Sequence, residues 1–426
     1  MFKLVRFEIK KIWNTTFFRL FLVAMVLFFV GYYVFVYINT TRLEDVTKPL
    51  EDVLQTLELG LEENKQALES AKEELEIKEL EETIEFEENY IKERKTEIEI
   101  LEEENWDAIL QIWIEDAEPY AESMRNSNDT HTYTHPTLFN LETYVAISKW
   151  MQEKDITPLL PADRHFSYLT FYDQEVNSTS RAEAELIMEF LKEQSNKYSS
   201  TSIHYLFRLF GILFSLTGAV FFLFLLGDIV TKEGLGRNGS INLLHTQPIK
   251  RHNILASKFF TAMLISLLIL VSAILFSIIV GSVFDRIGDW HYPVLIYGED
   301  RTFTLMSMGV FLIKAVGMFM LILFFCYTIL FLFSIITKRA LVALGLTIAT
   351  ILFGILVGEE LITLGIAQYI PFQYFSVFEV LTNELALTLE NFNLTYTNGM
   401  ISLSIASLVL LVVIYLVSFI QTKISN

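Results

Sequence analysis

Long blocks of apolar residues, separated by polar segments, dominate the chain. Crossing the roughly 30 Å hydrocarbon core of a bilayer takes about 20 mainly apolar residues in a helix, which is longer than most core helices of soluble domains. The apolar blocks of this chain are close to that length or longer. They predict an all-α membrane protein with six transmembrane helices, over residues 17–38, 203–229, 255–284, 303–336, 340–358 and 399–421.

The residues that precede the first block, 1–16, have a different pattern. Apolar residues recur at steps of three and four, at Phe2, Val5, Ile9 and Ile12, and Lys and Arg residues fall mostly between them. This spacing gives a helix one apolar and one basic face, which is typical of a helix that lies in the membrane interface. The alternative is that these basic residues only flank the first span.

A long polar segment, residues 39–202, separates the first two blocks. Its residues 43–104 are rich in Glu, Lys and Leu, which favours a long solvated helix or coiled coil. Heptad repeats occur in two phases, first at Leu54, Leu61, Leu68 and Leu75 and then at Ile77, Ile84, Ile91 and Ile98. The change of phase indicates a break in one helix or a change of partner helix. The heptad pattern is compatible with a single projecting helix and equally with a helical hairpin packed on residues 105–125 or 181–200.

Two further regions lack a long regular pattern. Residues 105–180 contain tryptophans, tyrosines and prolines, and they predict a small globular tip on the insert. Residues 359–398, before the last span, contain apolar pieces that are too broken to cross a membrane. We expect this second region to be an extracellular or re-entrant segment.

Basic residues gather in segments that an even number of spans would place on one side of the membrane. They occur before the first span, after the second and fourth spans, and at the end of the chain. Because Lys and Arg are enriched in cytoplasmic loops, both termini are predicted to be cytoplasmic and residues 39–202 extracellular.

The charge of the chain is unevenly distributed. Residues 39–202 carry 39 Asp and Glu against 15 Lys and Arg, a net charge of −24, while the rest of the chain is weakly basic. The acidic character therefore belongs to the insert, and it argues against a nucleic-acid partner.

The loop after the second span, residues 230–254, holds the most informative pattern. It contains a glycine-rich turn, a short amphipathic piece that includes Leu243 and Leu244, a proline at Pro248, and a basic cluster that ends at Arg251. A short amphipathic piece of this kind can dock into a groove on a cytosolic partner.

This loop resembles that of ABC-2 type transporter permeases. In that family an acidic residue and a glycine precede a Leu-Leu pair, a proline turn with an arginine, and a lysine that opens the next helix. The residues that fit these positions are Glu233, Gly234, Leu243, Leu244, Pro248, Arg251 and Lys258. The resemblance extends to the six spans, the leading interfacial helix and the re-entrant-like stretch. The long acidic insert departs from the common pattern.

The resemblance implies that this chain pairs with a second permease subunit, which is another copy of the chain or a paralogue. It also implies that this pair binds two cytosolic ABC ATPase subunits. It also implies that the loop acts as a coupling helix, with the residues from Glu233 to Arg251 named above as ATPase-coupling residues. The glycines at Gly234, Gly236 and Gly239 lack the Lys-Ser/Thr ending of a phosphate-binding loop. We therefore expect no enzyme activity and no cofactor in this chain, with ATP bound by the partner subunit.

Two cations lie at membrane depth in the predicted spans, Arg208 and Lys314. Ionisable residues in a membrane often mark a transport pathway, so these two are candidates for the substrate path. The alternative is that their long side chains reach the interface. No metal site is predicted, because His131, His135 and His165 lack supporting cysteines and a shared helix face.

Two functions follow from these patterns. The first is the permease subunit of an ATP-driven exporter of a hydrophobic or amphipathic compound, such as an antimicrobial peptide, drug or lipid, in a bacterial plasma membrane. The alternative is a transmembrane sensor or scaffold whose extracellular coiled coil binds an envelope ligand or a partner protein.

Overall fold

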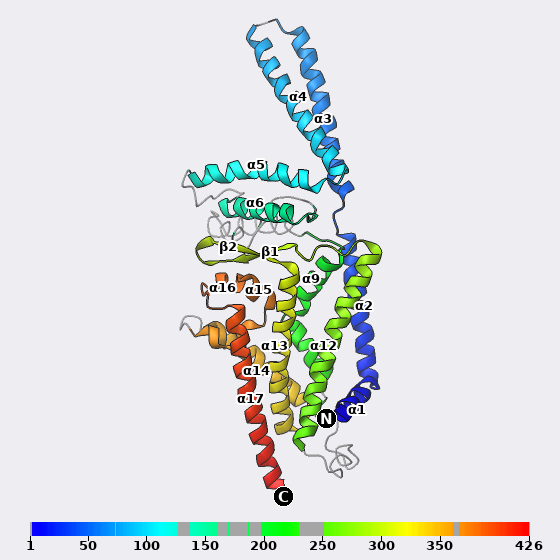
Figure 1. The fold of residues 1–426 in the computed structure, drawn as a ribbon, viewed down its shortest axis with the longest axis vertical. Helices are drawn as coiled ribbons and strands as arrows, with labels where there is room; N and C mark the ends of the chain where they lie inside the picture. The colour runs from blue at the N-terminus through cyan, green and yellow to red at the C-terminus, as the bar shows by residue number, and fades with distance from the viewer. Residues whose placement is uncertain are drawn as a thin grey trace. The chain divides into compact units, whose positions relative to one another are not determined.

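The computed structural model describes residues 2–72, 74–126, 137–160, 197–227, 251–360 and 366–425, together with residues 169, 186 and 229. These residues form two compact units (Figure 1). The membrane unit contains residues 1–35, 200–290 and 294–426, and the insert unit contains residues 36–199 and 291–293.

The membrane unit is built from long apolar helices. Five helices of the described chain are long and apolar enough to cross a bilayer, and a bent pair of shorter helices brings the candidates to six when the pair is counted as one span. The long helices are α2 (Thr16–Ile38), α12 (Arg251–Phe284), α13 (Met308–Thr337), α14 (Ala340–Glu360) and α17 (Tyr396–Ser425). The bent pair is α9 (Ser202–Leu213) and α10 (Leu216–Leu226). The prediction of an all-α membrane protein is confirmed.

Helix α13 forms the centre of the membrane unit. Over an 18-residue apolar stretch of α13, 67% of the residues are buried, whereas 17% are buried over the corresponding stretches of α14 and of α17. Helices α10, α12, α14 and α17 pack against it (Figure 1). Large apolar side chains on α14 and α17 remain exposed, among them Phe353 and Leu408. In lipid this arrangement is stable, because apolar side chains can face hydrocarbon as well as the protein interior.

The chain begins with helix α1 (Phe2–Trp13), over the residues predicted to form an interfacial helix. Its Val5 and Glu8 side chains are buried, while Phe2 and Trp13 are exposed. A turn then leads into α2, and the Thr15 hydroxyl accepts a hydrogen bond from the Phe18 backbone N–H at 3.3 Å.

The span predicted over residues 303–336 starts later in the structure than expected. Residues Phe303–Ser307 form strand β2, which pairs with β1 (Pro293–Tyr297), and α13 begins only at Met308. A turn at Gly298 joins the strands, with its N–H donating to the Thr302 carbonyl at 2.7 Å. Hydropathy misplaces this boundary because an apolar strand and the first turn of an apolar helix look alike in sequence.

The segment before the last span contains only short helical pieces in its described part, residues 366–395. They are two 3-10 turns (Ala367–Tyr369 and Pro371–Tyr374), α15 (Val377–Thr382) and α16 (Glu384–Thr388). The turns pack against α14 and α17, and α15 packs against α13. The segment therefore fills space inside the membrane unit.

In the insert unit, α3 (Leu43–Ser70) and α4 (Glu74–Glu102) lie side by side as an antiparallel pair (Figure 1). Ion pairs join Lys65 to Glu88 at 2.7 Å and Lys95 to Glu58 at 2.6 Å, so residue numbers rise on one helix as they fall on the other. The break falls where the heptad phase changes. Leu54, Leu61 and Leu68 of the first heptad series lie on α3, whereas Leu75 and the second series lie on α4. The two helices pack on each other, in place of one projecting helix of about 60 residues.

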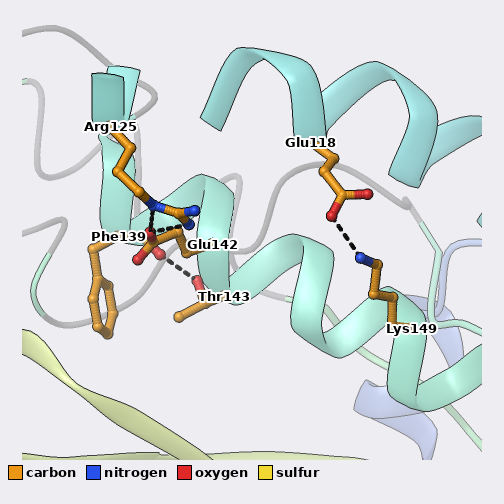
Figure 2. Close-up of polar contacts among 6 residues, drawn as sticks. All are labelled: Glu118, Arg125, Phe139, Glu142, Thr143 and Lys149. Atoms are coloured by element: carbon orange, nitrogen blue, oxygen red, sulfur yellow. Dashed lines mark hydrogen bonds and ion pairs between the residues drawn. The ribbon is translucent and has the colours of Figure 1, made fainter. Parts of the chain in front are cut away.

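Two more helices, α5 (Trp106–Asn126) and α6 (Leu138–Glu153), pack on each other in the region predicted as a globular tip. Their shared core includes Ile114, Met124 and the fully buried Leu141. Figure 2 shows the polar contacts at its edge, where Arg125 pairs with Glu142 at 2.7 Å and Lys149 with Glu118 at 2.6 Å. These pairs are largely exposed, so the apolar core supplies most of the stability of this helix pair.

Candidate functional site

The predicted coupling loop lies mostly outside the described residues. Among its candidate residues, Glu233, Gly234, Leu243, Leu244 and Pro248 belong to the part that is not described. Arg251 is the first residue of α12. The structure therefore shows how the loop is anchored at its two ends, at Ile229 and at the beginning of α12.

Lys258 contacts residues on both sides of this anchor. Lys258 lies two turns into α12, and its Nζ atom is 3.1 Å from Oε1 of Glu8 on α1. The same Nζ donates a hydrogen bond to the backbone carbonyl of Ile229 at 3.0 Å. The side chains of Lys258 and Glu8 are only 2% and 4% exposed. A buried ammonium needs such partners, because an uncompensated charge in an apolar interior is very costly.

Glu8 was not among the residues selected from the sequence. It is the sole acidic residue in positions 1–43, and it shares a helix face with Val5 and Ile12. An acidic residue on the apolar face of a basic helix indicates a buried cationic partner. That signal alone could have identified Glu8, although it could not have identified Lys258 as its partner.

A small pocket adjoins the ion pair. Its cavity of about 20 Å³ has room for roughly one water molecule. It is lined by Glu8, Lys11, Ile12, Thr15, Phe17, Phe18, Leu225, Leu226 and Ile229. Within the described part of the chain, Oε2 of Glu8 has no hydrogen-bond partner. Among these described residues, the polar contact of the carboxylate that the structure shows is the one from Oε1 to Lys258.

The second transmembrane segment is sharply bent. Helices α9 and α10 meet at 75°, with the break at Phe214 and Ser215. Gly218 makes this bend possible, because a Cβ atom at that position would lie 1.7 Å from the carbonyl oxygen of Leu213. No side chain larger than hydrogen fits so close to a backbone atom.

Polar groups gather at the bend. The Ser215 hydroxyl donates to the Ile212 carbonyl at 2.8 Å and lies 2.7 Å from the Thr217 hydroxyl. The Phe214 carbonyl accepts a hydrogen bond from the backbone N–H of Val377, at the beginning of α15, at 3.3 Å. Non-helical backbone at membrane depth requires partners of this kind. In many transporters, interrupted membrane helices of this type form part of the substrate site.

Aromatic rings fix the bend against its neighbours. Phe214 stacks on Phe210 and on Phe319 of α13, with ring centroids 4.3 and 4.6 Å apart. Phe378 of α15 packs against Phe207 and Phe311. Aromatic contacts with α13 and α15 therefore hold the bend in one position within the membrane unit.

The structure places the two candidate substrate-path cations on different helices. Arg208 is half-buried on α9, and Lys314 is half-buried on α13. The Lys314 ammonium lies 5.6 Å from the centroid of the Tyr396 ring, at the first residue of α17. This cation–π contact gives Lys314 a partner within the protein.

The residues considered for metal binding, His131, His135 and His165, lie outside the described part of the chain. Among the residues that the structure does describe, no group of three or more His, Cys, Asp or Glu side chains could hold a metal ion. The cysteine of the chain, Cys326, is buried in α13.

Comparison with known proteins agrees with this architecture. A family model described as ABC-2 family transporter protein matches residues 18–423, which include nearly all residues of the candidate spans. Comparisons with curated proteins and with solved structures give no significant match. Since the family model covers nearly the whole chain, this protein belongs to the ABC-2 transporter family.

Proposed function

We propose that the chain is the membrane-spanning subunit of an ATP-driven exporter in a bacterial plasma membrane. The observation that carries this proposal is the match to the ABC-2 family over residues 18–423, on a protein with six candidate spans. Proteins of this family are transport components of the membrane. The chain pairs with a second permease subunit, which is another copy of the chain or a paralogue. Two cytosolic ABC ATPase subunits bind and hydrolyse the ATP.

The distribution of basic residues supports the orientation of this exporter. Residues 230–250 are the part of the predicted loop 230–254 that precedes α12. In the proposed topology this loop 230–250 and both termini are cytosolic, while the acidic insert 39–202 faces outward. The loop then stands where an ATPase can bind it, and its amphipathic piece around Leu243 supplies the apolar contact.

The proposed substrate is a hydrophobic or amphipathic compound, such as an antimicrobial peptide, drug or lipid. The bend between α9 and α10 supports a route through this part of the membrane unit, because it places the Ser215 and Thr217 hydroxyls at the beginning of the otherwise apolar helix α10. Arg208 and Lys314 are the cations proposed to meet an anionic part of the substrate.

Alanine at Arg208 and Lys314 together is expected to lower transport in vesicles roughly fivefold, which corresponds to about 1 kcal/mol of lost stabilisation. Transport would be measured as ATP-dependent uptake of candidate compounds by inverted vesicles. Lys314→Arg keeps the cation beside Tyr396 and serves as the control. Unchanged transport by the double alanine variant would remove both residues from the substrate path.

Substitutions in the loop test the coupling role. Glu233→Ala and Leu243→Ala are expected to lower the number of substrate molecules moved per ATP by about tenfold. The reason is that binding of the ATPase to the loop would no longer be coupled to a movement of the membrane helices. ATP hydrolysis and transport would be measured together on the permease co-purified with its ATPase. Asn242→Ala, in the same loop but outside the resemblance, is the control. Full coupling in the Glu233 and Leu243 variants would show that the loop is not the coupling element.

A further inference from the structure

Three segments that are distant in sequence meet at the Lys258 ammonium. Glu8 belongs to α1, Ile229 lies where the loop 230–250 begins, and Lys258 follows where that loop ends. The lysine therefore closes the base of the loop and also ties that base to α1. All three residues are at least 95% buried, so solvent does not compete for these contacts.

Stability alone gives a weak reason for a buried ion pair at this place. Apolar residues of similar volume often stabilise an interior as well as a buried ion pair does, because the pair must be desolvated. In some proteins buried polar or ionic groups instead fix the register between the elements that they join. Here the joined elements are the interfacial helix, the base of the loop and a transmembrane helix.

The contacts continue from this joint into the spans. Helix α1 is fixed to α2 across a tight turn, where the Arg19 side chain donates to the Trp13 carbonyl at 2.9 Å and to Asn14 Oδ1 at 3.1 Å. Helix α2 in turn accepts a hydrogen bond at the Phe29 carbonyl from the Tyr205 hydroxyl of α9, at 2.7 Å. A displacement of the loop base thus has a continuous path to the bent second span.

We propose that Glu8 and Lys258 are positioning residues that make α1, α12 and the base of the loop move as one body. This inference rests on the proposed function, in which an ATPase displaces the loop. The ion pair then converts that displacement into a movement of α12 directly and of α2 through α1. Among the described residues Oε2 of Glu8 has no hydrogen-bond partner, and together with the adjoining cavity this leaves the carboxylate room to follow the ammonium.

Shape-conserving variants test the proposal. Glu8→Gln and Lys258→Met are each expected to keep the ATPase subunit bound and its hydrolysis within about twofold of the original, while transport per ATP falls roughly tenfold. The double variant should be no worse than Lys258→Met alone, because that single change already removes the contacts of the ammonium to Glu8 and to Ile229. Glu8→Asp keeps the charge and should retain more of the transport per ATP than Glu8→Gln.

The double variant also covers the case in which a single variant fails to fold. It leaves no charge buried without its partner, which avoids the most costly consequence of changing one residue alone. Ser266→Ala removes a buried hydrogen bond of 2.7 Å to Tyr327, between α12 and α13, and is the matched control that should keep its coupling ratio. If the folded double variant moves as much substrate per ATP as the original protein, the positioning role is refuted. If the original protein shows no ATP-dependent transport, the proposed function fails instead.

Discussion

Replacing Gly218 by alanine is expected to abolish transport and to lower the yield of folded protein strongly. The new Cβ atom would lie 1.7 Å from the carbonyl oxygen and 2.6 Å from the carbonyl carbon of Leu213. Both are backbone atoms, so no side-chain rotation relieves the clash, and α9 and α10 must change their angle. Overpacking of this kind costs on the order of 3 kcal/mol or more.

The change of angle also removes the contacts that hold the bend. The Phe214 carbonyl would lose its hydrogen bond from Val377, and the ring of Phe214 would leave Phe319. The measurement is thermal unfolding of the purified protein in detergent together with vesicle transport. Gly345→Ala is the matched control, since a Cβ atom there meets nothing within 4 Å. Normal folding and transport by the Gly218→Ala variant would show that the second span is not bent as described.

Alanine at Gly281 is expected to separate α9 from α12 and to destabilise the membrane unit by about 3 kcal/mol. At this crossing the new Cβ atom would lie 2.5 Å from the backbone nitrogen of Ser202 and 2.6 Å from its Cα atom. A small residue is needed where two membrane helices approach so closely.

Three hydrogen bonds depend on that approach. The N–H groups of Ser202 and Ile203 donate to the carbonyls of Arg286 and Ile287 at 3.0 and 3.1 Å, and the Ser202 hydroxyl donates to the Ile278 carbonyl. Hydrogen exchange of the Ser202 and Ile203 amides should accelerate in the variant. Gly31→Ala, in open space on α2, should leave exchange at these amides unchanged. Protection of both amides as in the original protein would contradict the described helix crossing.

The number of spans and the break in the insert could be predicted from the sequence because both depend on local patterns. Hydropathy over about 20 residues identifies a membrane helix. The shift from the heptad of Leu54 to that of Ile77 indicated either a break in one helix or a change of partner helix, and the structure has one helix ending at Ser70 and the next beginning at Glu74. The proposed role of this insert as a sensor or scaffold stays a prediction.

The bend in the second span could not be predicted in the same way. Residues 203–229 are mainly apolar and contain no proline, so neither hydropathy nor a proline signals a 75° change of direction. The bend depends on Gly218, and glycine is frequent in straight membrane helices as well. Strand β2 was missed for a similar reason, since its five residues continue into the apolar run of α13.

The Glu8–Lys258 pair depends on a contact between residues that are far apart in the chain. The resemblance to ABC-2 permeases pointed to Lys258 as the residue that opens the third span, but it assigned no partner. Only the packing of α1 on α12 brings Glu8 to the ammonium. The residues of the loop itself, from Glu233 to Pro248, lie outside the described structure, and their role stays a prediction.

The central claim is that the loop 230–250 binds an ABC ATPase on the side of the membrane opposite to the insert. Site-specific photo-crosslinking in intact cells tests it, with the crosslinker placed at position 243 or at position 86, where Phe86 is 70% exposed on α4. We expect a crosslinked product with the co-expressed ATPase from position 243 and none from position 86. A product from position 86, or none from position 243 in a folded protein, would contradict the account.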